Sequence, residues 1–310
     1  MPQSFENNLD PLSQVLGMLK PRSYVSAGLD AGGDWAIRLP APDGIKFNTI
    51  LRGACWLAVD GDTPHRIEQG DCFLLTQGRS FTLTSDLGLE PIEARVIYER
   101  AGNDIAVCNG GGDFFLIGGR YTFASNQAHL FGGLPPVIHI RKDRAQASVL
   151  HWSLEQLAAE VRGRLPGGTL VAEHLAHIML VQVLRLYLEE QHGTRAGWFF
   201  ALADRRIGPV LHAMHADPAR RWALQDLASL ARMSRSTFAE KFKQVVGCAP
   251  LEYLAQWRSF VACNRLRHSN ESLASIAVSL GYESSSAFSA AFKRIMQIPP
   301  GEYRRQANGG

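Results

Sequence analysis

The chain has 310 residues, too many for one small hydrophobic core, and its composition of 46% hydrophobic and 20% charged residues is that of a folded protein. This balance excludes a largely disordered chain and a fibrous repeat protein. The net charge of +3 is unevenly distributed, because residues 205–306 carry 15 Lys and Arg against 7 Asp and Glu, which gives them +8 and leaves −5 for the rest. The segregation predicts a polyanionic partner for the C-terminal part, although a solvated basic surface would have the same charge.

The sequence contains no recognisable targeting or membrane-spanning segment. Residues 1–11 lack the basic and then apolar pattern of a secretory signal. The most apolar helical run, His177 to Leu188, is shorter than the ~20 residues that cross a bilayer. Without a Cys-x-x-Cys pair, the cysteines are expected to be reduced thiols with no zinc or redox role. These features predict a cytoplasmic protein.

Short apolar or alternating runs separated by turn residues fill the chain from Gly44 to about Glu99. The expected elements are a strand over Ala54–Val59, a hairpin turn at Asp60-Gly61, a strand from Gly70-Asp71 through Leu75, a strand over Phe81–Thr84, and returning strands within Tyr121–Ile140. Strands at this spacing predict a small β-barrel or β-sandwich. We assign residues 1–150 to this mainly-β front domain.

Helical periodicity replaces the strand pattern near Ser153. Ser153 and Gln156 form a capping-box pattern that predicts the start of a helix. Gly167-Gly168 separates it from a longer amphipathic helix, Leu170–Gln191. Residues 151–204 are therefore expected to form a helical hairpin whose apolar stripe either pairs with a second copy of the chain or braces the protein internally.

The C-terminal part contains an internal duplication with a period of 50 residues. The repeated residues are Ser234, Ser236, Phe238, Phe242, Lys243, Pro250, Glu252 and Tyr253, which recur as Ser284, Ser286, Phe288, Phe292, Lys293, Pro300, Glu302 and Tyr303. Eight identities in one order across twenty positions are difficult to obtain by chance. One supersecondary unit has been used twice.

Each copy reads as a short helix, a tight turn and a second helix. The first helices are expected at Leu224–Ala231 and Leu273–Leu280, and Ser234 and Ser284 stand where the second helices need an N-cap. Two helix-turn-helix units are therefore expected over about 224–246 and 273–296.

The second helix of each unit has an apolar face and a polar face. The apolar residues, committed to a core, are Phe238, Phe242, Val245, Phe288, Phe292 and Ile295. Small and polar side chains on the opposite face allow the helix backbone to approach the floor of a DNA major groove. The residues expected to contact DNA are Arg235, Ser236, Thr237, Ala239, Glu240, Lys243, Ser284, Ser285, Ser286, Ser289, Ala290, Lys293 and Arg294.

One long helix is expected between the two units, over Pro250–His268. Proline suits its first position, and Leu251, Leu254, Trp257 and Val261 follow at helical intervals. Such a rod, about 28 Å long at 1.5 Å per residue, would hold the two reading helices about one turn of DNA apart.

The region from about Arg205 to Arg305 resembles the DNA-binding domain of the AraC/XylS transcription regulators. The motifs that carry the resemblance begin at Met233 (MSRSTF), Val246 (VGCAPLEYL), Ile276 (IA), Gly281 (GYESSSAFSAAFK) and Pro299 (PPGEYR). The front domain, with the motifs GACWLAVDG from Gly53, GDCFLL from Gly70 and LPPVIH from Leu134, is similar to the cupin-like sensor of one branch of the family. The resemblance implies a multi-domain α+β fold in which a ligand-sensing cupin-like barrel and a helical hairpin precede an all-α domain, residues 205–306, with two helix-turn-helix units.

Three positions depart from the pattern of that family. Many members have arginine, which makes the commonest guanine contact, where this chain has Glu240 and Ala290. Glu240 could accept a hydrogen bond from a cytosine amino group or could merely repel poor sites. Ala223 stands where Ser or Thr would cap a helix, which should weaken the helix start by on the order of 1 kcal/mol.

The resemblance implies a sequence-specific DNA-binding transcription regulator controlled by a small molecule, either apolar or aromatic, or oxidised or electrophilic. Trp56, His65 and Arg79 are the candidate effector contacts in the front domain, each equally able to be structural. The expected partners are double-stranded DNA, the small-molecule effector, a second copy of the chain and RNA polymerase.

Two other classes of function fit parts of the sequence. A metal-dependent cupin enzyme needs clustered histidines and a carboxylate. In the front domain, His65 is followed by Glu68, but His129 and His139 are distant from them in sequence. A protein-binding adaptor would use the basic tail for an acidic partner. We expect no catalytic residue, no metal and no cofactor, and therefore a protein that is not an enzyme.

Overall fold

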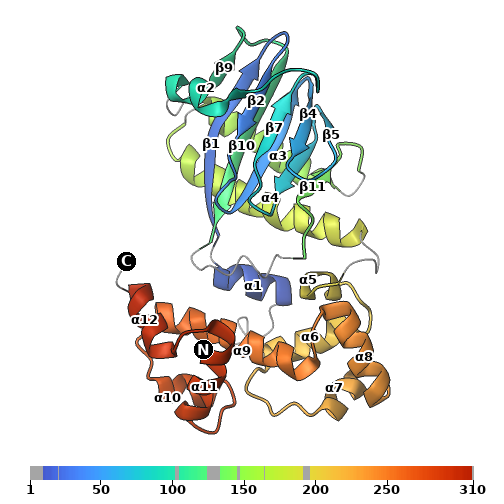
Figure 1. The fold of residues 1–310 in the computed structure, drawn as a ribbon, viewed down its shortest axis with the longest axis vertical. Coiled ribbons are helices and arrows are strands. Elements are labelled where there is room, and N and C mark those ends of the chain that lie inside the picture. The colour runs from blue at the N-terminus through green and yellow to red at the C-terminus, as the bar shows by residue number, and fades with distance from the viewer. Residues whose placement is uncertain are drawn as a thin grey trace. The chain divides into compact units, whose positions relative to one another are not determined.

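A computed structural model describes residues 10–19, 21–101, 105–123, 133–144, 147–163, 165–190 and 196–308. The chain divides into two compact units, Leu19–Glu190 and a helical unit that joins Met1–Met18 to Gln191–Gly310 (Figure 1). His129, considered as a metal ligand, and Gln191, the expected end of the long helix, lie outside the described residues.

The front unit, Leu19–Glu190, is built on two β-sheets (Figure 1). The strands of the first sheet, in spatial order, are β11 (Val137–Ile140), β6 (Cys72–Leu75), β3 (Ile45–Arg52), β10 (Phe114–Thr122), β1 (Arg22–Ala31) and β9 (Ala106–Cys108). Those of the second are β5 (His65–Glu68), β4 (Ala54–Val59), β7 (Phe81–Thr84), β2 (Ala36–Leu39) and β8 (Ile92–Glu93).

The core of the front unit lies between the two sheets. Leu29 and Ile50 from the first sheet and Leu57 and Leu83 from the second belong to one buried cluster. Because successive side chains of a strand point to opposite faces, strands such as β4, β6 and β7 contribute every second residue to this cluster. The alternation noted along β7 agrees with this, since Phe81 and Leu83 both belong to the cluster.

The strands expected at β4, β6 and β7 are confirmed, and so is the turn at Asp60-Gly61, where Gly61 has φ +76° between the antiparallel β4 and β5. The expectation of strands as far as Glu99 is wrong, because α2 (Ala94–Ala101) is a helix. Ala94 and Ile97 are buried one turn apart, a helical spacing too short to stand out against the surrounding strands.

Two helices, α3 (Ser148–Gly163) and α4 (Gly168–Glu190), form the expected hairpin within the front unit. The helix start expected at Ser153 is wrong. Ser153 lies inside α3, buried, and its hydroxyl donates to the carbonyl oxygen of Val149 at 2.8 Å, a bond that serines make in mid-helix.

Helix α4 covers the outer face of the first sheet. The Tyr121 hydroxyl on β10 donates to the carbonyl oxygen of Ala176 on α4 at 2.6 Å, and the Ser23 hydroxyl on β1 donates to that of Glu173 at 3.1 Å. Among the described residues, α4 alone is long and apolar enough to cross a membrane, and 44% of its most apolar window is buried against the rest of the protein.

The helical unit contains nine described helices (Figure 1). They are α1 (Pro11–Leu19), α5 (Trp198–Ala201), α6 (Ile207–Ala216), α7 (Leu224–Leu230), α8 (Arg235–Val246), α9 (Pro250–His268), α10 (Leu273–Ser279), α11 (Ser285–Met296) and α12 (Pro300–Asn308). The predicted long helix is confirmed as α9, with Pro250 at its first position. Leu254 and Trp257 are buried as expected, but Leu251 is 50% exposed and does not belong to the core.

Candidate nucleic-acid interface and effector pocket

The two copies of the sequence repeat pack in the same way. In the first copy, the ring centroids of Phe238 and Phe242 lie 5.6 Å apart, and Phe242 lies 5.9 Å from Tyr253 on α9. The equivalent distances in the second copy are 5.7 Å between Phe288 and Phe292 and 5.7 Å from Phe292 to Tyr303 on α12. The apolar faces of α8 and α11 are thus anchored by one aromatic arrangement used twice.

Both reading helices begin with a serine N-cap, as predicted. The Ser234 hydroxyl accepts a hydrogen bond from the backbone N–H of Thr237 at 3.3 Å, and the Ser284 hydroxyl accepts one from Ala287 at 3.1 Å. Both helices also end in a left-handed residue, Gly247 in α8 and Gln297 in α11.

The turns of the two units share one backbone path. In the first, the Met233 N–H donates to the carbonyl oxygen of Ala228 at 3.0 Å, and in the second the Tyr282 N–H donates to that of Ala277 at 3.0 Å. The second unit then has one more residue, Glu283, before its N-cap serine. Helix α11 therefore starts one residue further from its turn than α8 does.

The polar faces of α8 and α11 are open to solvent. Ser236 and Ser286 are exposed, and so are Lys243 and Lys293. Neither lysine forms an ion pair with any residue that the structure describes, in contrast to Lys241, whose ammonium lies 3.0 Å from the Asp204 carboxylate. Of the thirteen residues expected to contact DNA, only Ala239 and Ser289 are half-buried and the rest are exposed.

Arg258, on α9, joins the two helix-turn-helix units. Its guanidinium donates to the carbonyl oxygens of Pro218 at 2.7 Å and Arg220 at 3.0 Å, in the loop before α7. The same guanidinium lies over the ring of Tyr282, in the turn before α11, at 5.4 Å from the centroid. Arg221 and Glu283 add an exposed ion pair of 2.7 Å between the same two segments. These contacts fix the orientation of one unit against the other.

In the front unit, the three candidate effector contacts do not form one site. Trp56 lies under the guanidinium of Arg66, 5.5 Å from the ring centroid. His65 contacts the Asp62 carboxylate at 3.4 Å, and Arg79 donates to the carbonyl oxygen of Asp60 at 3.2 Å. Trp56 and His65 also lie on opposite faces of their sheet, because His65 is paired with the core residue Leu57 and Trp56 is next to it.

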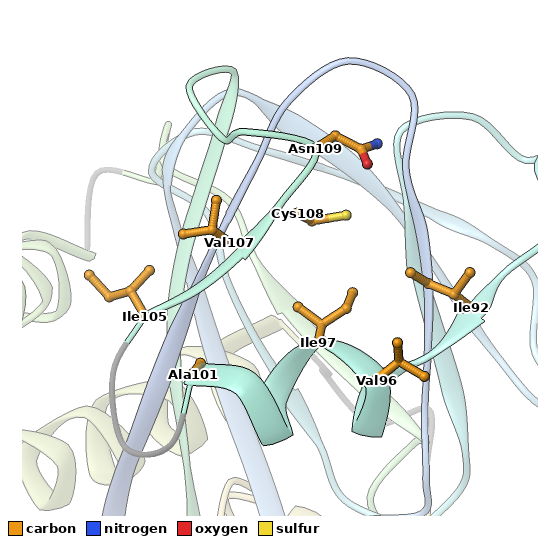
Figure 2. A pocket seen from close by; sticks show the side chains of 8 residues that line it. All are labelled: Ile92, Val96, Ile97, Ala101, Ile105, Val107, Cys108 and Asn109. Carbon is orange, nitrogen blue, oxygen red and sulfur yellow. The ribbon is translucent and has the colours of Figure 1, made fainter.

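A pocket of about 350 Å³ opens instead between α2 and the segment around β9 (Figure 2). Sequence reasoning missed it because it depends on α2. Its lining residues are Ile92, Val96, Ile97, Ala101, Ile105, Val107, Cys108 and Asn109. Figure 2 shows Val96 and Ile97 rising from α2 toward Cys108. Aliphatic side chains with one thiol, one amide and no charged group suit an uncharged apolar molecule.

Burial keeps the thiols of the front unit protonated. It raises the pKa of Cys55 and of Cys72 to about 12 and also raises the pKa of Cys108, the thiol in the pocket. The thiolate is the reactive form. The pocket thiol, Cys108, is therefore held in its less reactive form.

Comparison with known proteins identifies the family. The cupin family model matches residues 10–189, and a helix-turn-helix domain model matches residues 227–306. An AraC-like transcription regulator of Streptomyces lividans is 48% identical over 96% of this chain and 98% of its own length. The chain belongs to the AraC-like transcription regulators. A second member, from Streptomyces antibioticus, is 46% identical over 96% of this chain and 99% of its own length. The DNA-bound domain of AdpA, a global transcriptional factor, is 28% identical, with a TM-score of 0.33, and covers 34% of this chain and 98% of that one.

As an AraC-like regulator, the protein is a DNA-binding transcription regulator with a cupin-like front domain. The expected resemblance and fold class are confirmed. The departures from the family pattern lie where the sequence indicated, with Glu240 and Ala290 exposed on α8 and α11. At the start of α7, Ala223 has no capping side chain and its N–H donates to the Asp226 carboxylate at 3.3 Å.

Proposed function

We propose that α8 and α11 of this AraC-like regulator read two successive major-groove segments of one duplex. The observation that carries the proposal is that two identically built helices expose equivalent polar faces and are joined through Arg258. Phosphate contacts position a protein on DNA, and contacts to base edges give it specificity. Lys243 and Lys293, exposed and unpaired among the described residues, are assigned to phosphates.

We assign base recognition to the small and polar side chains on the exposed faces of α8 and α11. These are Ser236 and Glu240 on α8 and Ser285, Ser286 and Ser289 on α11. Arg235, Thr237, Ala239, Ser284, Ala290 and Arg294 complete the proposed interface. With Glu240 in place of the usual arginine, the first unit is expected to prefer cytosine on the contacted strand.

Selection of bound duplexes from a random pool tests this function. The expected result is a site with two recognised segments about 10 base pairs apart, one for each helix. A salt titration on the selected site should show log affinity falling steeply and linearly with log salt. A shallow slope with no preference for duplex DNA would instead favour the protein-binding adaptor.

The front domain is proposed to bind the small molecule that controls the regulator. Support comes from the pocket beside α2, whose volume of about 350 Å³ lies within the range of ligand sites. A thermal-shift screen of small uncharged hydrocarbons and aromatic compounds on the full chain tests this. Replacing Val107, on the pocket wall, with Asp should abolish a stabilisation that Val278→Asp, at an exposed valine on α10 in the helical unit, leaves intact. If no compound stabilises the protein, the effector proposal fails.

We further propose that the protein acts as a homodimer through the α3–α4 hairpin. Val149 and Trp152 on α3 and Val171 and Ile178 on α4 are large apolar residues that remain exposed. Sedimentation of the wild type and of Trp152→Glu should show a dimer and a monomer, respectively. Contact with RNA polymerase, action in the cytoplasm, and the division into residues 1–150, 151–204 and 205–306 stay predictions.

A further inference from the structure

Strands β3 and β10 carry an unusual set of polar side chains on the face that they turn away from α4. Their antiparallel register places Lys46 opposite Arg120 and Asn48 opposite Gly118, and directly opposed residues share a face of the sheet. Ile50, two residues beyond Asn48, belongs to the core between the sheets. Lys46 and Asn48 therefore point to the inner side of the first sheet.

The charges of this set are not neutralised. Lys46 is half-buried, its ammonium forms no ion pair or hydrogen bond with any described residue, and its cross-strand neighbour is the cation Arg120. The Arg120 guanidinium lies over the ring of Tyr24, 5.5 Å from the centroid, and forms no ion pair within the described ranges. Burial, together with the charge of Arg120, lowers the pKa of Lys46 to about 8. Two opposed like charges on one sheet face destabilise the fold.

Asn48 adds a donor without an acceptor. Its side chain is 1% exposed, and its amide nitrogen is buried with no hydrogen-bond partner in the described structure. A Cβ on Gly118 would lie 2.3 Å from Asn48 Oδ1, so the amide occupies the space that the glycine opposite leaves free. A buried unsatisfied donor is destabilising, and an acceptor on a bound molecule would satisfy it.

Apolar side chains border the set on its other side. In the register of β3 with β6, Lys46 is opposite Leu75 and Asn48 is opposite Phe73, and both of these are buried. A molecule that reached the three polar groups would therefore meet cations on the β10 side and hydrocarbon on the β6 side. Exposed Arg120 and Tyr24 give access from solvent.

We propose that Lys46, Arg120 and Asn48 bind the anionic head group of an amphiphilic organic acid whose apolar part lies along β6. This inference rests on the proposed effector function and names a second, anionic class of ligand, since the pocket beside α2 has no charged lining residue. A carboxylate would accept hydrogen bonds from all three donors and neutralise the opposed cations.

Isothermal titration calorimetry on the full chain tests the proposal. Decanoate and cinnamate are each compared with the corresponding primary amide, which is uncharged. The acids should bind at least tenfold more tightly than the amides. Lys46→Met and Arg120→Gln should each weaken acid binding at least tenfold. Arg66→Gln, which removes a cation from β5 on the other sheet, should not.

A second measurement separates binding from a structural role. Without ligand, Lys46→Met should raise the melting temperature, because it removes a buried charge from beside Arg120. A lower melting temperature together with unchanged acid affinity would overturn the site. Equal binding of acids and amides would also overturn the anion site, but the proposed effector function would still hold. If neither acids, amides nor any uncharged compound bound, both the anion site and the effector function would be contradicted.

Discussion

Gly281 of the second helix-turn-helix unit lies directly against the carbonyl oxygen of Ala219, in the loop that leads into the first unit. A Cβ added at Gly281 would lie 2.1 Å from that oxygen, and the residue has φ +78°, a backbone conformation that favours glycine. The contact sits beside Arg258, whose guanidinium spans the same two segments. One glycine therefore allows the two units to pack as a single body.

Gly281→Ala is expected to separate these units. The substitution must move the Ala219 carbonyl and strain the backbone, so urea unfolding should show a loss of about 2 kcal/mol or more, and affinity for a two-segment DNA site should fall. Gly247→Ala is the matched control, because Gly247 also has positive φ but an added Cβ would meet open space. Equal losses for the two variants would mean that contact between the units is unimportant.

Gln297 occupies the left-handed position that ends α11, with φ 63°, where the first unit has Gly247. Gln297→Gly should raise the free energy of unfolding by about 0.5–1 kcal/mol, because glycine adopts this conformation without strain. Gln297→Ala removes the 2.9 Å hydrogen bond from the side chain to the Arg294 carbonyl oxygen but keeps the strain, so it should not stabilise. Thermal unfolding of both variants decides the point.

The first helices of the two units differ in their N-caps. The Ser272 hydroxyl accepts a hydrogen bond from the Ser275 N–H at 3.0 Å at the start of α10, whereas Ala223 offers none at the start of α7. Ala223→Ser should stabilise the helical unit by about 1 kcal/mol and Ser272→Ala should destabilise it by a similar amount. If chemical denaturation shows no gain for Ala223→Ser, the Asp226 carboxylate already serves the helix start.

Lys243→Ala and Lys293→Ala are expected to weaken binding to all duplexes alike and to flatten the salt slope by about one unit each. The reason is that each lysine, free of any ion pair within the described residues, would release counterions on contact with a phosphate. Lys241→Ala is the control, since that lysine is held by Asp204. Fluorescence anisotropy at several salt concentrations measures the slopes, and a loss confined to one sequence would contradict the phosphate assignment.

His215, only 4% exposed, stacks on Trp257 with ring centroids 3.6 Å apart and contacts the Tyr253 hydroxyl at 2.7 Å. Burial lowers its pKa from 6.5 to about 3. The unfolded chain therefore binds a proton between these values that the folded protein does not, and stability falls as the pH drops below about 6.5.

Unfolding midpoints measured from pH 7 to pH 4 should show this loss, and His215→Phe should reduce the slope by up to one proton. A wild-type slope in the His215→Phe protein would show that other groups cause the acid sensitivity.

Local sequence patterns predicted the elements whose side chains repeat regularly. The strand at Phe81–Thr84 follows from alternation, and α9 follows from Pro250 and the apolar spacing after it. The same reasoning failed at Ser153, because a serine that bonds back to Val149 resembles an N-cap in sequence. It also missed α2, whose two turns are too few for a helical period to emerge.

The duplication, the paired phenylalanines and the N-cap serines determined, without coordinates, that the chain carries two helix-turn-helix units with exposed polar faces. These features are local, since a helix face or a cap depends on residues a few positions apart. Tertiary structure alone decided how the units are held together, through Gly281, Ala219 and Arg258, and which side chains meet at the α2 pocket and around Lys46. Strand register brings Lys46 and Arg120 together, and helix packing brings Gly281 to Ala219, although the members of each pair are more than 60 residues apart. The pocket residues are closer in sequence but meet only because α2 folds as a helix.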